Sequence, residues 1–401
     1  MFRQSPVPAP DGPAMTGPAA ASRFLAVGLT TTALTHLGYP VVIRLAARRR
    51  LRTAPVLPTP ADAELPSVTV VVPAYEEARF ISNKLQDVLA QDYPADRLEI
   101  VVVDDGSQDG TAELAERATR RARVVRHTER RGKTQALNTG VAVARGDVVV
   151  FTDANGSLLA GSLRNVVAPF AEPRVAVVGG TKRPVGTGVH GAGESTYWKL
   201  ENGLRSAESA FGAVVGVDGG IYAVRRSAFR PIPEGVYADD YWISLDALRR
   251  GLHVVHVSEA SAIESVGAGK RGDFERRTRI AAGIWKESLA HLDLLDPRRK
   301  WVALAFLFHR VLRTGAVPAL LPALVPAAVL AGRRSRSARL LAWGQAFCWV
   351  AAGAGALSSA PSLAVPYQFA VTNMAALRGG GRQFRRRQSS LWKRTERGPW
   401  R

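Results

Sequence analysis

Apolar and polar positions alternate in blocks between residues 66 and 260. Short runs rich in Val and Ile predict buried strands at 68–72, 98–103, 122–126 and 147–152, with further strands near 175–181, 214–224 and 252–258. Amphipathic stretches predict helices at 77–91, 110–121, 133–144, 193–211 and 239–250. The joints between these elements carry Gly, Asp, Asn and Ser. This alternation predicts an α/β fold with a parallel sheet.

Long apolar runs flank this region. The first, Phe24–Ile43, carries no formal charge and is close to the ~20 residues that a membrane-spanning helix needs. Five arginines follow it between Arg44 and Arg52, whereas a cleaved signal peptide carries its positive charges before the apolar run. We therefore expect a retained transmembrane helix whose C-terminal end faces the cytoplasm. The alternative is a buried helix of a soluble domain.

Apolar runs return after residue 300. Trp301–Leu312 is interrupted by a His-Arg pair, which suggests an interfacial helix. Thr314–Ala331 and Leu340–Leu357 are plausible spans, and Ser362–Leu377 is short enough either to span or to lie in the interface. The expected location is the plasma membrane, crossed more than once, with the α/β domain on the cytoplasmic side. The predicted organisation is a disordered N-terminus at 1–22, a transmembrane helix at 23–47, a linker at 48–65, the α/β domain at 66–300, interfacial and transmembrane helices at 301–380 and a basic tail at 381–401.

The chain of 401 residues has a net charge of +20, which first suggests nucleic acid or an anionic membrane surface as a partner. Many of the basic residues flank the apolar runs, which is the pattern of membrane proteins. Zinc-finger spacing, helix-turn-helix signatures and RNP-like motifs are absent from the sequence, so we expect a lipid bilayer and no nucleic acid. Cys348 is the only cysteine, which excludes an intrachain disulfide and a Cys-based metal cage.

Acidic residues follow three of the predicted strands at the point where each strand ends. The segments read PAYEE at 73–77, DDGS at 104–107 and DAN at 153–155. Carboxyl ends of parallel strands meet at one sheet edge, where open α/β folds bind ligands. Carboxylate and amide oxygens bind Mg²⁺ or Mn²⁺, and substrate phosphates complete the coordination. The three ends suggest a site for a divalent cation and a phosphorylated ligand, although each segment alone is also a good turn or helix cap.

The order of these segments is more specific than any one of them. PAYEE, DDGS, Gly132-Lys133 and DAN occur on successive strand–helix units. In this order they resemble the family 2 glycosyltransferases, which are nucleotide-sugar enzymes with a GT-A fold. The resemblance implies a Rossmann-like, mostly parallel mixed sheet. The resemblance covers roughly residues 66–300. With its flanking apolar runs, the chain is similar to the membrane-integrated branch of that family, which includes cellulose-, chitin- and hyaluronan-synthase-like proteins.

The resemblance implies a role for each matching residue. Nucleotide-sugar binding would fall to Ala74, Tyr75, Glu76, Asp104, Asp105, Lys133 and Arg279. Asp153 would hold Mg²⁺ or Mn²⁺, together with Asn155, which stands where the family often has a second Asp. Arg279 is kept from the Gln-x-x-Arg-Trp motif of processive synthases, but the Trp of that motif is replaced by Ile280.

The same resemblance implies a base and an acceptor loop further along the chain. Asp240 would be the general base, and Asp239 would be the neighbouring carboxylate that raises its pKa. The alternative is a pair of acids that stabilises a helix N-terminus. Asp218, Gly219 and Gly220 match the acceptor-side loop, where glycines let the backbone approach a sugar closely. A glycine-rich turn is the alternative there.

Together these features predict a membrane-bound, inverting glycosyltransferase. It would transfer a sugar from a UDP-sugar to a polysaccharide or a lipid-linked acceptor, and a divalent cation would assist departure of the diphosphate. The missing Trp leaves open a non-processive enzyme that adds one sugar to a lipid. A catalytically silent membrane scaffold and a dinucleotide-dependent oxidoreductase are further alternatives, but the latter would need a Gly-x-Gly-x-x-Gly cradle that the first strand turn lacks.

Overall fold

The computed structural model describes residues 17–52, 62–185, 188–265, 270–333, 335–358 and 360–385. The predicted N-terminal segment, linker and basic tail each lie partly outside the described residues. The described parts of the N-terminal segment and of the linker differ from the prediction, because a helix already begins at Pro18 and a second one continues to Leu51. Residues 18–22 are therefore helical, and the first four residues of the predicted linker, 48–51, extend the preceding helix.

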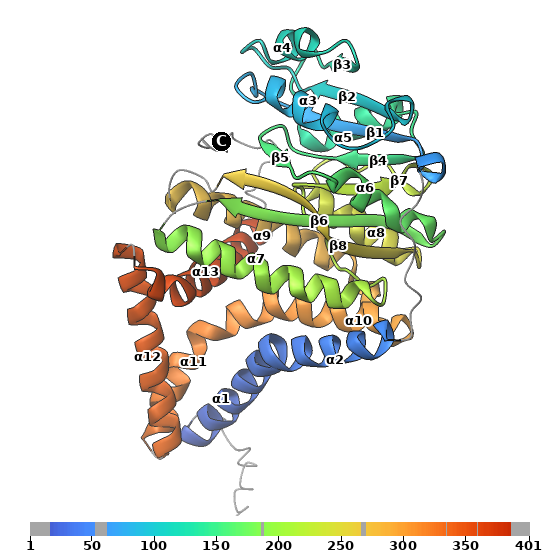
Figure 1. The fold of residues 1–401 in the computed structure, drawn as a ribbon. Coiled ribbons are helices and arrows are strands. Elements are labelled where there is room, and N and C mark those ends of the chain that lie inside the picture. The colour runs from blue at the N-terminus through green and yellow to red at the C-terminus, as the bar shows by residue number, and fades with distance from the viewer. Residues whose placement is uncertain are drawn as a thin grey trace, which may run out of the picture.

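An eight-stranded mixed sheet forms the centre of the α/β region (Figure 1). The strands are β1 (Val68–Ala74), β2 (Leu98–Asp104), β3 (Ala122–Arg126), β4 (Val148–Phe151), β5 (Gly156–Leu158), β6 (Val175–Val185), β7 (Tyr222–Arg225) and β8 (His253–Ser265). Their order in the sheet is β3-β2-β1-β4-β7-β6-β8-β5. The pairs β1–β2, β1–β4, β2–β3 and β6–β8 are parallel, and β4–β7, β6–β7 and β5–β8 are antiparallel. The predicted α/β fold with a mixed sheet is confirmed.

The helices cover both faces of this sheet and form a separate layer below it. They are α1 (Pro18–Ala33), α2 (Tyr39–Leu51), α3 (Ile81–Leu89), α4 (Thr111–Ala118), α5 (Lys133–Val143), α6 (Ser162–Val167), α7 (Gly188–Ser209), α8 (Asp239–Arg249), α9 (Lys270–Ala290), α10 (Trp301–Ala305), α11 (Val317–Gly332), α12 (Arg336–Leu357) and α13 (Ala364–Phe384). In Figure 1, α7 runs beneath the sheet, α10 and α2 lie below α7, and α1 and α12 reach the bottom of the molecule. The helix α13 packs against α9 and α7, and α1 packs against α11.

The sheet is buried on both faces because its strands are apolar at nearly every position. Alternate residues of a strand point to opposite faces, and in β1 Val70 and Val72 join one hydrophobic cluster while Val71 joins the other. The cluster with Val71 also includes Tyr39 and Ile43 of α2. The N-terminal helical segment therefore shares a core with the sheet.

Gly140 of α5 is required for close packing of that helix against β1. A Cβ atom at this position would lie 2.4 Å from Cγ1 of Val71 in the core. We expect Gly140→Ala to lower the free energy of unfolding by about 1–3 kcal/mol through overpacking. Gly344→Ala on α12, where nothing lies within 4 Å of the added atom, should instead be neutral or stabilising by up to ~1 kcal/mol. Thermal unfolding of both variants in detergent tests this; an unchanged melting temperature for Gly140→Ala would contradict the packing argument.

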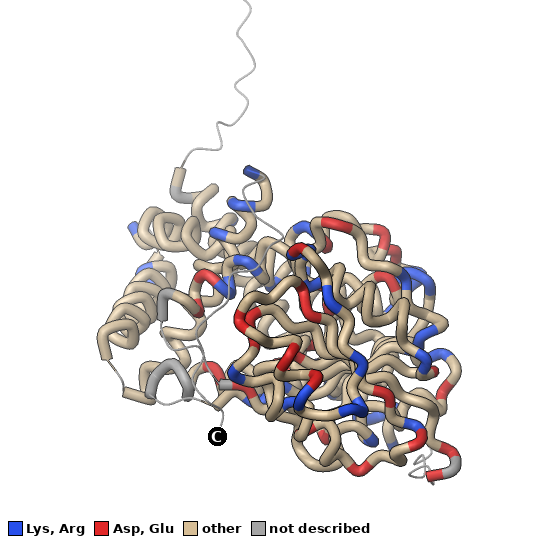
Figure 2. Tube along the Cα trace, turned by 90° about the horizontal axis from the view of Figure 1, so that it is seen from above, with Lys and Arg blue, Asp and Glu red and all other residues tan. Residues whose placement is uncertain are grey.

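Within the residues that the structure describes, three helical segments are long and apolar enough to cross a membrane: Ala19–Leu51, Trp301–Gly332 and Arg336–Leu357. All three are longer than predicted. Trp301–Gly332 is one helical segment, because the π-helical turns Phe306–Ala316 continue α10 into α11, so the predicted interfacial helix and span are not separate. In Figure 2 the charged residues are concentrated over the sheet-bearing part, and the helices at the left are largely uncharged. This distribution is typical of a protein with a membrane-facing end.

Candidate active site

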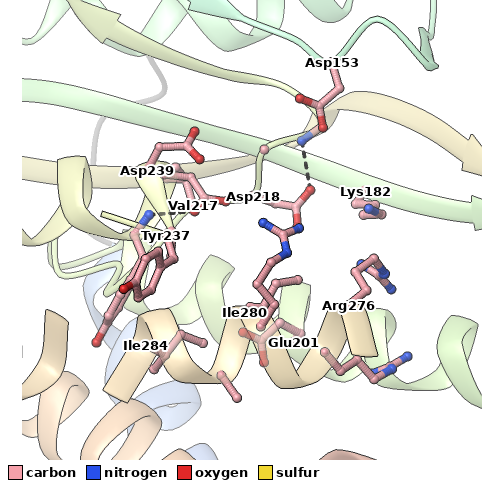
Figure 3. Close-up of a pocket in the computed structure, with 18 of the residues that line it drawn as sticks. Asp153, Lys182, Glu201, Val217, Asp218, Tyr237, Asp239, Arg276, Ile280 and Ile284 are labelled. Atoms are coloured by element: carbon pink, nitrogen blue, oxygen red, sulfur yellow. Dashed lines mark hydrogen bonds between the residues drawn. The ribbon is translucent and has the colours of Figure 1, made fainter. Parts of the chain in front are cut away.

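A cavity of about 280 Å³ lies where the loops after β1 and β4 meet the loop before β7 and the start of α8. Its walls carry nine of the predicted site residues: Lys133, Asp153, Asn155, Asp218, Gly219, Gly220, Asp239, Asp240 and Arg279. Figure 3 shows Asp153 at the top of the cavity, Asp239 on one side, and Lys182 with Arg276 on the other. Segments that are distant in the sequence thus bring these carboxylates and cations together.

Lys133, the first residue of α5, stands between two of the carboxylates. Its Nζ donates a hydrogen bond of 2.8 Å to Oδ1 of Asp153 and lies 3.7 Å from Oδ2 of Asp239. Burial lowers the pKa of Lys133, but the nearby carboxylates, led by Asp153 and Asp239, outweigh burial and raise it above its usual value. Lys133 therefore remains a cation and offsets part of the negative charge of the site.

Asp240 lies in the wall of the cavity at the start of α8. Desolvation by the surrounding protein, followed by the carboxylates of Asp239 and Asp218, raises its pKa to about 7. The opposing influences are weaker: the charge of Lys133 and a hydrogen bond of 2.8 Å from the backbone N–H of Tyr241 to Oδ1. A carboxyl with this pKa exchanges a proton near neutral pH, which is the property a general base requires.

Asp239 has a different environment from Asp240. It is buried and accepts a hydrogen bond of 3.2 Å from the hydroxyl of Tyr222, the first residue of β7. Both Tyr222 and Lys133 therefore hold the Asp239 carboxylate in place. This arrangement fits a supporting carboxylate beside Asp240, as the sequence predicts.

The loop before β7 brings backbone close to all of these groups. A Cβ atom on Gly219 would lie 3.5 Å from Nζ of Lys133, 3.6 Å from Oδ2 of Asp240 and 3.9 Å from Oδ2 of Asp153. The absence of a side chain at Gly219 thus leaves space at the centre of the acidic cluster. Asp218 keeps the loop in shape by accepting a hydrogen bond of 3.0 Å from the backbone N–H of Gly220. The strand predicted at 214–224 begins only at Tyr222, because this loop occupies the preceding residues.

Five of the predicted nucleotide-binding residues lie outside the cavity wall, at the ends of β1 and β2: Ala74, Tyr75, Glu76, Asp104 and Asp105. The guanidinium of Arg130 stacks on the ring of Tyr75 at 3.7 Å. Glu76 has a positive φ of 54°, which is uncommon for a residue with a side chain. The backbone N–H of Glu76 donates a hydrogen bond of 2.8 Å to Oγ of Ser107. The turn after β1 is thus held in an unusual conformation next to the cavity.

The two aspartates at the end of β2 differ in their contacts. Asp105 accepts hydrogen bonds from the backbone N–H groups of Arg131 and Gly132 at 2.9 and 2.7 Å, and it also contacts His127. Its carboxylate therefore fixes the loop that presents Lys133. Asp104 accepts one long bond from the N–H of Ser107 through Oδ2, and Oδ1 has no hydrogen-bond partner among the described residues. Of the pair, Asp104 is the one with capacity left for a ligand.

A divalent cation would find hard oxygen ligands at Asp153 and Asn155. Among the described residues, no group of three or more His, Cys, Asp or Glu could hold a cation alone. Asp153 and Asn155 both line the cavity and could supply carboxylate and amide oxygens to one side of an ion. Mg²⁺ and Mn²⁺ commonly take their remaining ligands from substrate phosphates and water. The donor set fits a cation that arrives with a diphosphate.

The opposite wall of the cavity is basic and partly aromatic. Arg276 bonds Asp273 at 2.7 Å and Glu194 at 3.2 Å, and Lys182 pairs with Glu264. The predicted residue Arg279 and its neighbour Ile280 also face the cavity. This wall combines several cations with acids that keep most of them paired.

Sequence reasoning missed several residues of the site. Arg130 and Trp198 contact predicted residues or line the cavity, but neither stands in a recognisable motif. Tyr222 lies at the end of the acceptor-side loop segment, but the sequence assigns it no role, whereas the structure shows that it bonds Asp239. Trp198 belongs to the amphipathic helix predicted at 193–211. It follows Tyr197 on α7 and lines the cavity together with Glu201 and Arg205. Apart from helical spacing, nothing in the sequence indicates this position.

Residues 69–232 match the family described as Glycosyl transferase family 2. Among curated proteins, glycosyltransferase AglE of Haloferax volcanii is 36% identical over 119 residues, which are 29% of this chain and 39% of that protein. An N-acetylglucosaminyltransferase of Rhizobium meliloti is 26% identical over 251 residues, 58% of each chain. This chain therefore spans between two-fifths and three-fifths of these relatives' lengths.

One solved structure resembles the chain over most of its length. The mannosyltransferase PcManGT from Pyrobaculum calidifontis, in complex with GDP-Man and Mn²⁺, has a TM-score of 0.70 and 29% sequence identity; the match covers 90% of this chain and 99% of that one. Because it covers 90% of this chain, the similarity extends beyond the family 2 region. Residues 69–232 thus resemble family 2 glycosyltransferases, and the mixed sheet of the chain is GT-A-like.

Proposed function

We propose that this protein is a membrane-bound, inverting glycosyltransferase. It would transfer a sugar from a nucleotide sugar to a polysaccharide or a lipid-linked acceptor. The observation that carries the proposal is the position of Asp240, a carboxyl with a pKa of about 7, in the same cavity as Asp153 and Lys133. Asp240 can accept a proton, while Lys133 and a cation held by Asp153 would bind the leaving group.

In this mechanism the acceptor hydroxyl attacks the anomeric carbon of the donor sugar from the side of Asp240. Asp240 takes the proton of the hydroxyl, and the bond to the nucleoside diphosphate breaks on the opposite side, so the configuration inverts. Lys133 and Arg279 would stabilise the negative charge on the departing diphosphate. A cation held by Asp153 and Asn155 would, when bound, neutralise further charge on the same group.

The donor is proposed as a nucleoside-diphosphate sugar, and UDP is the nucleotide that the sequence resemblance implies. The Pyrobaculum protein is described in complex with GDP-Man, and the rhizobial relative is an N-acetylglucosaminyltransferase. Asp104, with one carboxylate oxygen unpartnered among the described residues, and Tyr75 would contact the nucleoside. A donor screen must therefore include both UDP- and GDP-sugars.

Transfer of a single sugar to a lipid is favoured over processive polymerisation. Ile280 faces the cavity where processive synthases carry a Trp, so the wall at this position offers no ring on which a growing chain could stack. Trp198 lies on α7 instead, where its ring contacts Arg205 and Lys182. The length of the product made from one radiolabelled donor distinguishes single transfer from polymerisation.

The activity should depend on pH with a limb set by Asp240. A general base works in its ionised form, so kcat/KM should fall as pH decreases through about 7. Asp218 contributes to the raised pKa through its charge, so Asp218→Asn should move this limb to lower pH. The measurement is kcat/KM against pH for both proteins. A limb that stays in place, or moves to higher pH, would be inconsistent with Asp240 as the base.

The proposed function is tested by release of nucleotide from a panel of UDP- and GDP-sugars. The purified full chain in detergent, with Mn²⁺ or Mg²⁺, should release the nucleotide from at least one donor when acceptor lipids are present. NMR of the product should show an anomeric configuration opposite to that of the donor. Retention of configuration would contradict the single-displacement mechanism, and lack of binding to every donor would remove the proposal.

A further inference from the structure

A completely buried lysine lies against the turn that carries the proposed cation ligands. Lys84 is 0% exposed, and it shares the buried stripe of α3 with Ile81, Leu85 and Val88, which belong to one of the two hydrophobic clusters of the sheet. The spacing of these four positions is that of a core-facing stripe, where an ammonium group is rarely found. Moving a charge out of water costs free energy, so this lysine calls for an explanation beyond packing.

The ammonium of Lys84 holds both ends of the cation turn, residues 152–156. Its Nζ donates a hydrogen bond of 2.8 Å to Oγ1 of Thr152, which follows β4. It donates a second one of 3.0 Å to the carbonyl of Gly156, which begins β5. Both proposed cation ligands stand between these two contacts in the sequence. One charged group therefore fixes the turn at its two ends, and the positions of both ligands depend on it.

Asp87, three residues further along α3, extends this anchor to the strand after the turn. It pairs with Lys84 at 3.8 Å. Its carboxylate accepts hydrogen bonds from Oγ of Ser157 at 3.0 Å and from the backbone N–H of Leu158 at 2.7 Å. Burial lowers the pKa of Lys84 to about 8, and the charges of nearby carboxylates, led by Asp87 and Asp153, oppose this decrease. Lys84 is therefore a cation at neutral pH, with carboxylates as its counter-charges.

The hydroxyl of Thr152 links the cation turn to the acceptor-side loop. Its Oγ1 accepts the hydrogen bond from Lys84 and donates one of 2.9 Å to the carbonyl of Gly220. The backbone N–H of Gly220 in turn bonds Asp218 at 3.0 Å. A hydroxyl can accept and donate at the same time, which an apolar side chain cannot do. A continuous chain of hydrogen bonds therefore runs from α3 through Thr152 to the loop that lies against Asp240.

We infer that Lys84 is a positioning residue that, through Thr152, sets the geometry of the cation turn and of the acceptor-side loop together. This inference rests on the proposed function, because it concerns the ligands of the proposed cation. An apolar residue of similar volume at position 84 would serve stability as well as the buried charge does. It could not hold two loops at once. Loss of either group should therefore weaken binding of the cation, although neither is a proposed ligand.

Thr152→Val tests this link without changing any charge. Binding of Mn²⁺ to the full chain in detergent, with UDP or GDP present, is measured by electron paramagnetic resonance. The variant should bind the ion about tenfold more weakly, because groups that orient metal ligands typically contribute that much. Thr152→Ser keeps the hydroxyl and should recover most of the affinity. Equal affinity of Thr152→Val and the wild type would overturn the inference.

Lys84→Met separates positioning from charge. The substitution removes a positive charge that acts on Asp153, so a purely electrostatic role of Lys84 predicts tighter binding of Mn²⁺. A positioning role predicts weaker binding, again by about tenfold. Tighter or unchanged binding by this variant would overturn the inference. The two Thr152 variants decide the question if Lys84→Met does not fold.

Thr69→Val is the matched control. Thr69 is a fully buried threonine near the start of β1, at the opposite end of the parallel strands from Thr152. Its hydroxyl also makes two hydrogen bonds, to Glu99 at 2.6 Å and from the backbone N–H of Gly146 at 2.9 Å. Both Thr→Val variants should lower the melting temperature by similar amounts, but Thr69→Val should leave the affinity for Mn²⁺ unchanged. An equal loss of affinity in both would indicate general destabilisation and overturn the inference.

Hydrogen exchange without nucleotide or cation makes the coupling of the two loops testable apart from the proposed function. The backbone N–H groups of Gly156 and Gly220 bond the carbonyl of Asp153 and the carboxylate of Asp218. Thr152→Val should speed exchange in peptides that cover both glycines by about tenfold, whereas Thr69→Val should not. Unchanged exchange around Gly220 would overturn the coupling. A wild-type chain that binds no nucleotide would instead contradict the glycosyltransferase proposal.

Discussion

Asp240→Asn is expected to reduce nucleotide release from the donor sugar by about 10²–10⁴-fold while the donor still binds. The amide cannot accept the proton of the attacking hydroxyl, and general base catalysis typically contributes a factor of this size. The side chain keeps its shape, so the backbone N–H of Tyr241 can still bond its oxygen. The measurements are steady-state nucleotide release and calorimetric titration of the nucleotide sugar.

The control for this variant is Asp246→Asn on the same helix. Asp246 pairs with Arg250 at 2.8 Å and does not line the cavity, so its loss should leave kcat within about threefold of the wild type.

The stability of Asp240→Asn should also differ from that of the wild type. The pKa of Asp240 is higher in the folded state than its ordinary value, so its ionisation above pH 7 opposes folding. Asp240→Asn should therefore raise the unfolding free energy at pH 8, by about 1–4 kcal/mol. Full activity of Asp240→Asn would refute its role.

Asp153→Asn should remove stimulation by Mn²⁺ and lower nucleotide release by about 10²–10³-fold. Asp153 is the only carboxylate among the proposed cation ligands, and it also bonds Lys133 at 2.8 Å. Its loss would leave two amides, at residues 153 and 155, to bind the ion. Electron paramagnetic resonance of Mn²⁺ in the presence of UDP or GDP should show weaker binding of the ion to the variant.

Asp147→Asn is the matched control for Asp153. Asp147 precedes β4, at the opposite end of the strand from Asp153, and its carboxylate accepts a hydrogen bond of 2.7 Å from Ser67 at the surface. Binding of Mn²⁺ and nucleotide release should both be unchanged by this substitution. If Asp153→Asn bound Mn²⁺ and turned over donor as well as Asp147→Asn does, the cation would have to be held elsewhere.

The strands of the first half of the sheet could be predicted because each is a buried, uninterrupted apolar run. The predicted run at 68–72 became β1 and that at 98–103 became β2, each extended by two residues at most. The run at 214–224 failed because Gly216, with a φ of 127°, and the following loop turn the chain before β7 can begin. Apolar composition alone does not separate a buried loop from a strand.

The site could be predicted best where a residue follows a strand or opens a helix. Asp153, Lys133 and Asp240 belong to such positions, and the structure brings all three to one cavity. Asp105 looks equivalent to Asp104 in the sequence, yet it fixes the loop before α5 through two backbone hydrogen bonds. Its role depends on where residues 131–132 pass, and no local pattern encodes that contact.

The part of the cavity between α7 and the C-terminal helices could not be predicted for a related reason. Arg205 lies in a helix that reads as an ordinary amphipathic segment, and Arg310 lies in an apolar run 105 positions later. They meet at Glu201 because α7 packs beneath the sheet and against the C-terminal helices. Such a contact depends on tertiary packing, whereas hydrophobic periodicity reports only which face of each helix is covered.

The most direct test of the central claim is a structure of Asp240→Asn with an intact nucleotide sugar and Mn²⁺. The predicted result has the diphosphate and Asp153 sharing the ion, the nucleoside next to Tyr75, and the anomeric carbon facing residue 240 across the space left by Gly219. A nucleotide sugar bound outside this cavity, or one whose anomeric carbon faces away from residue 240, would contradict the assignment of Asp240 as the base of a glycosyl transfer.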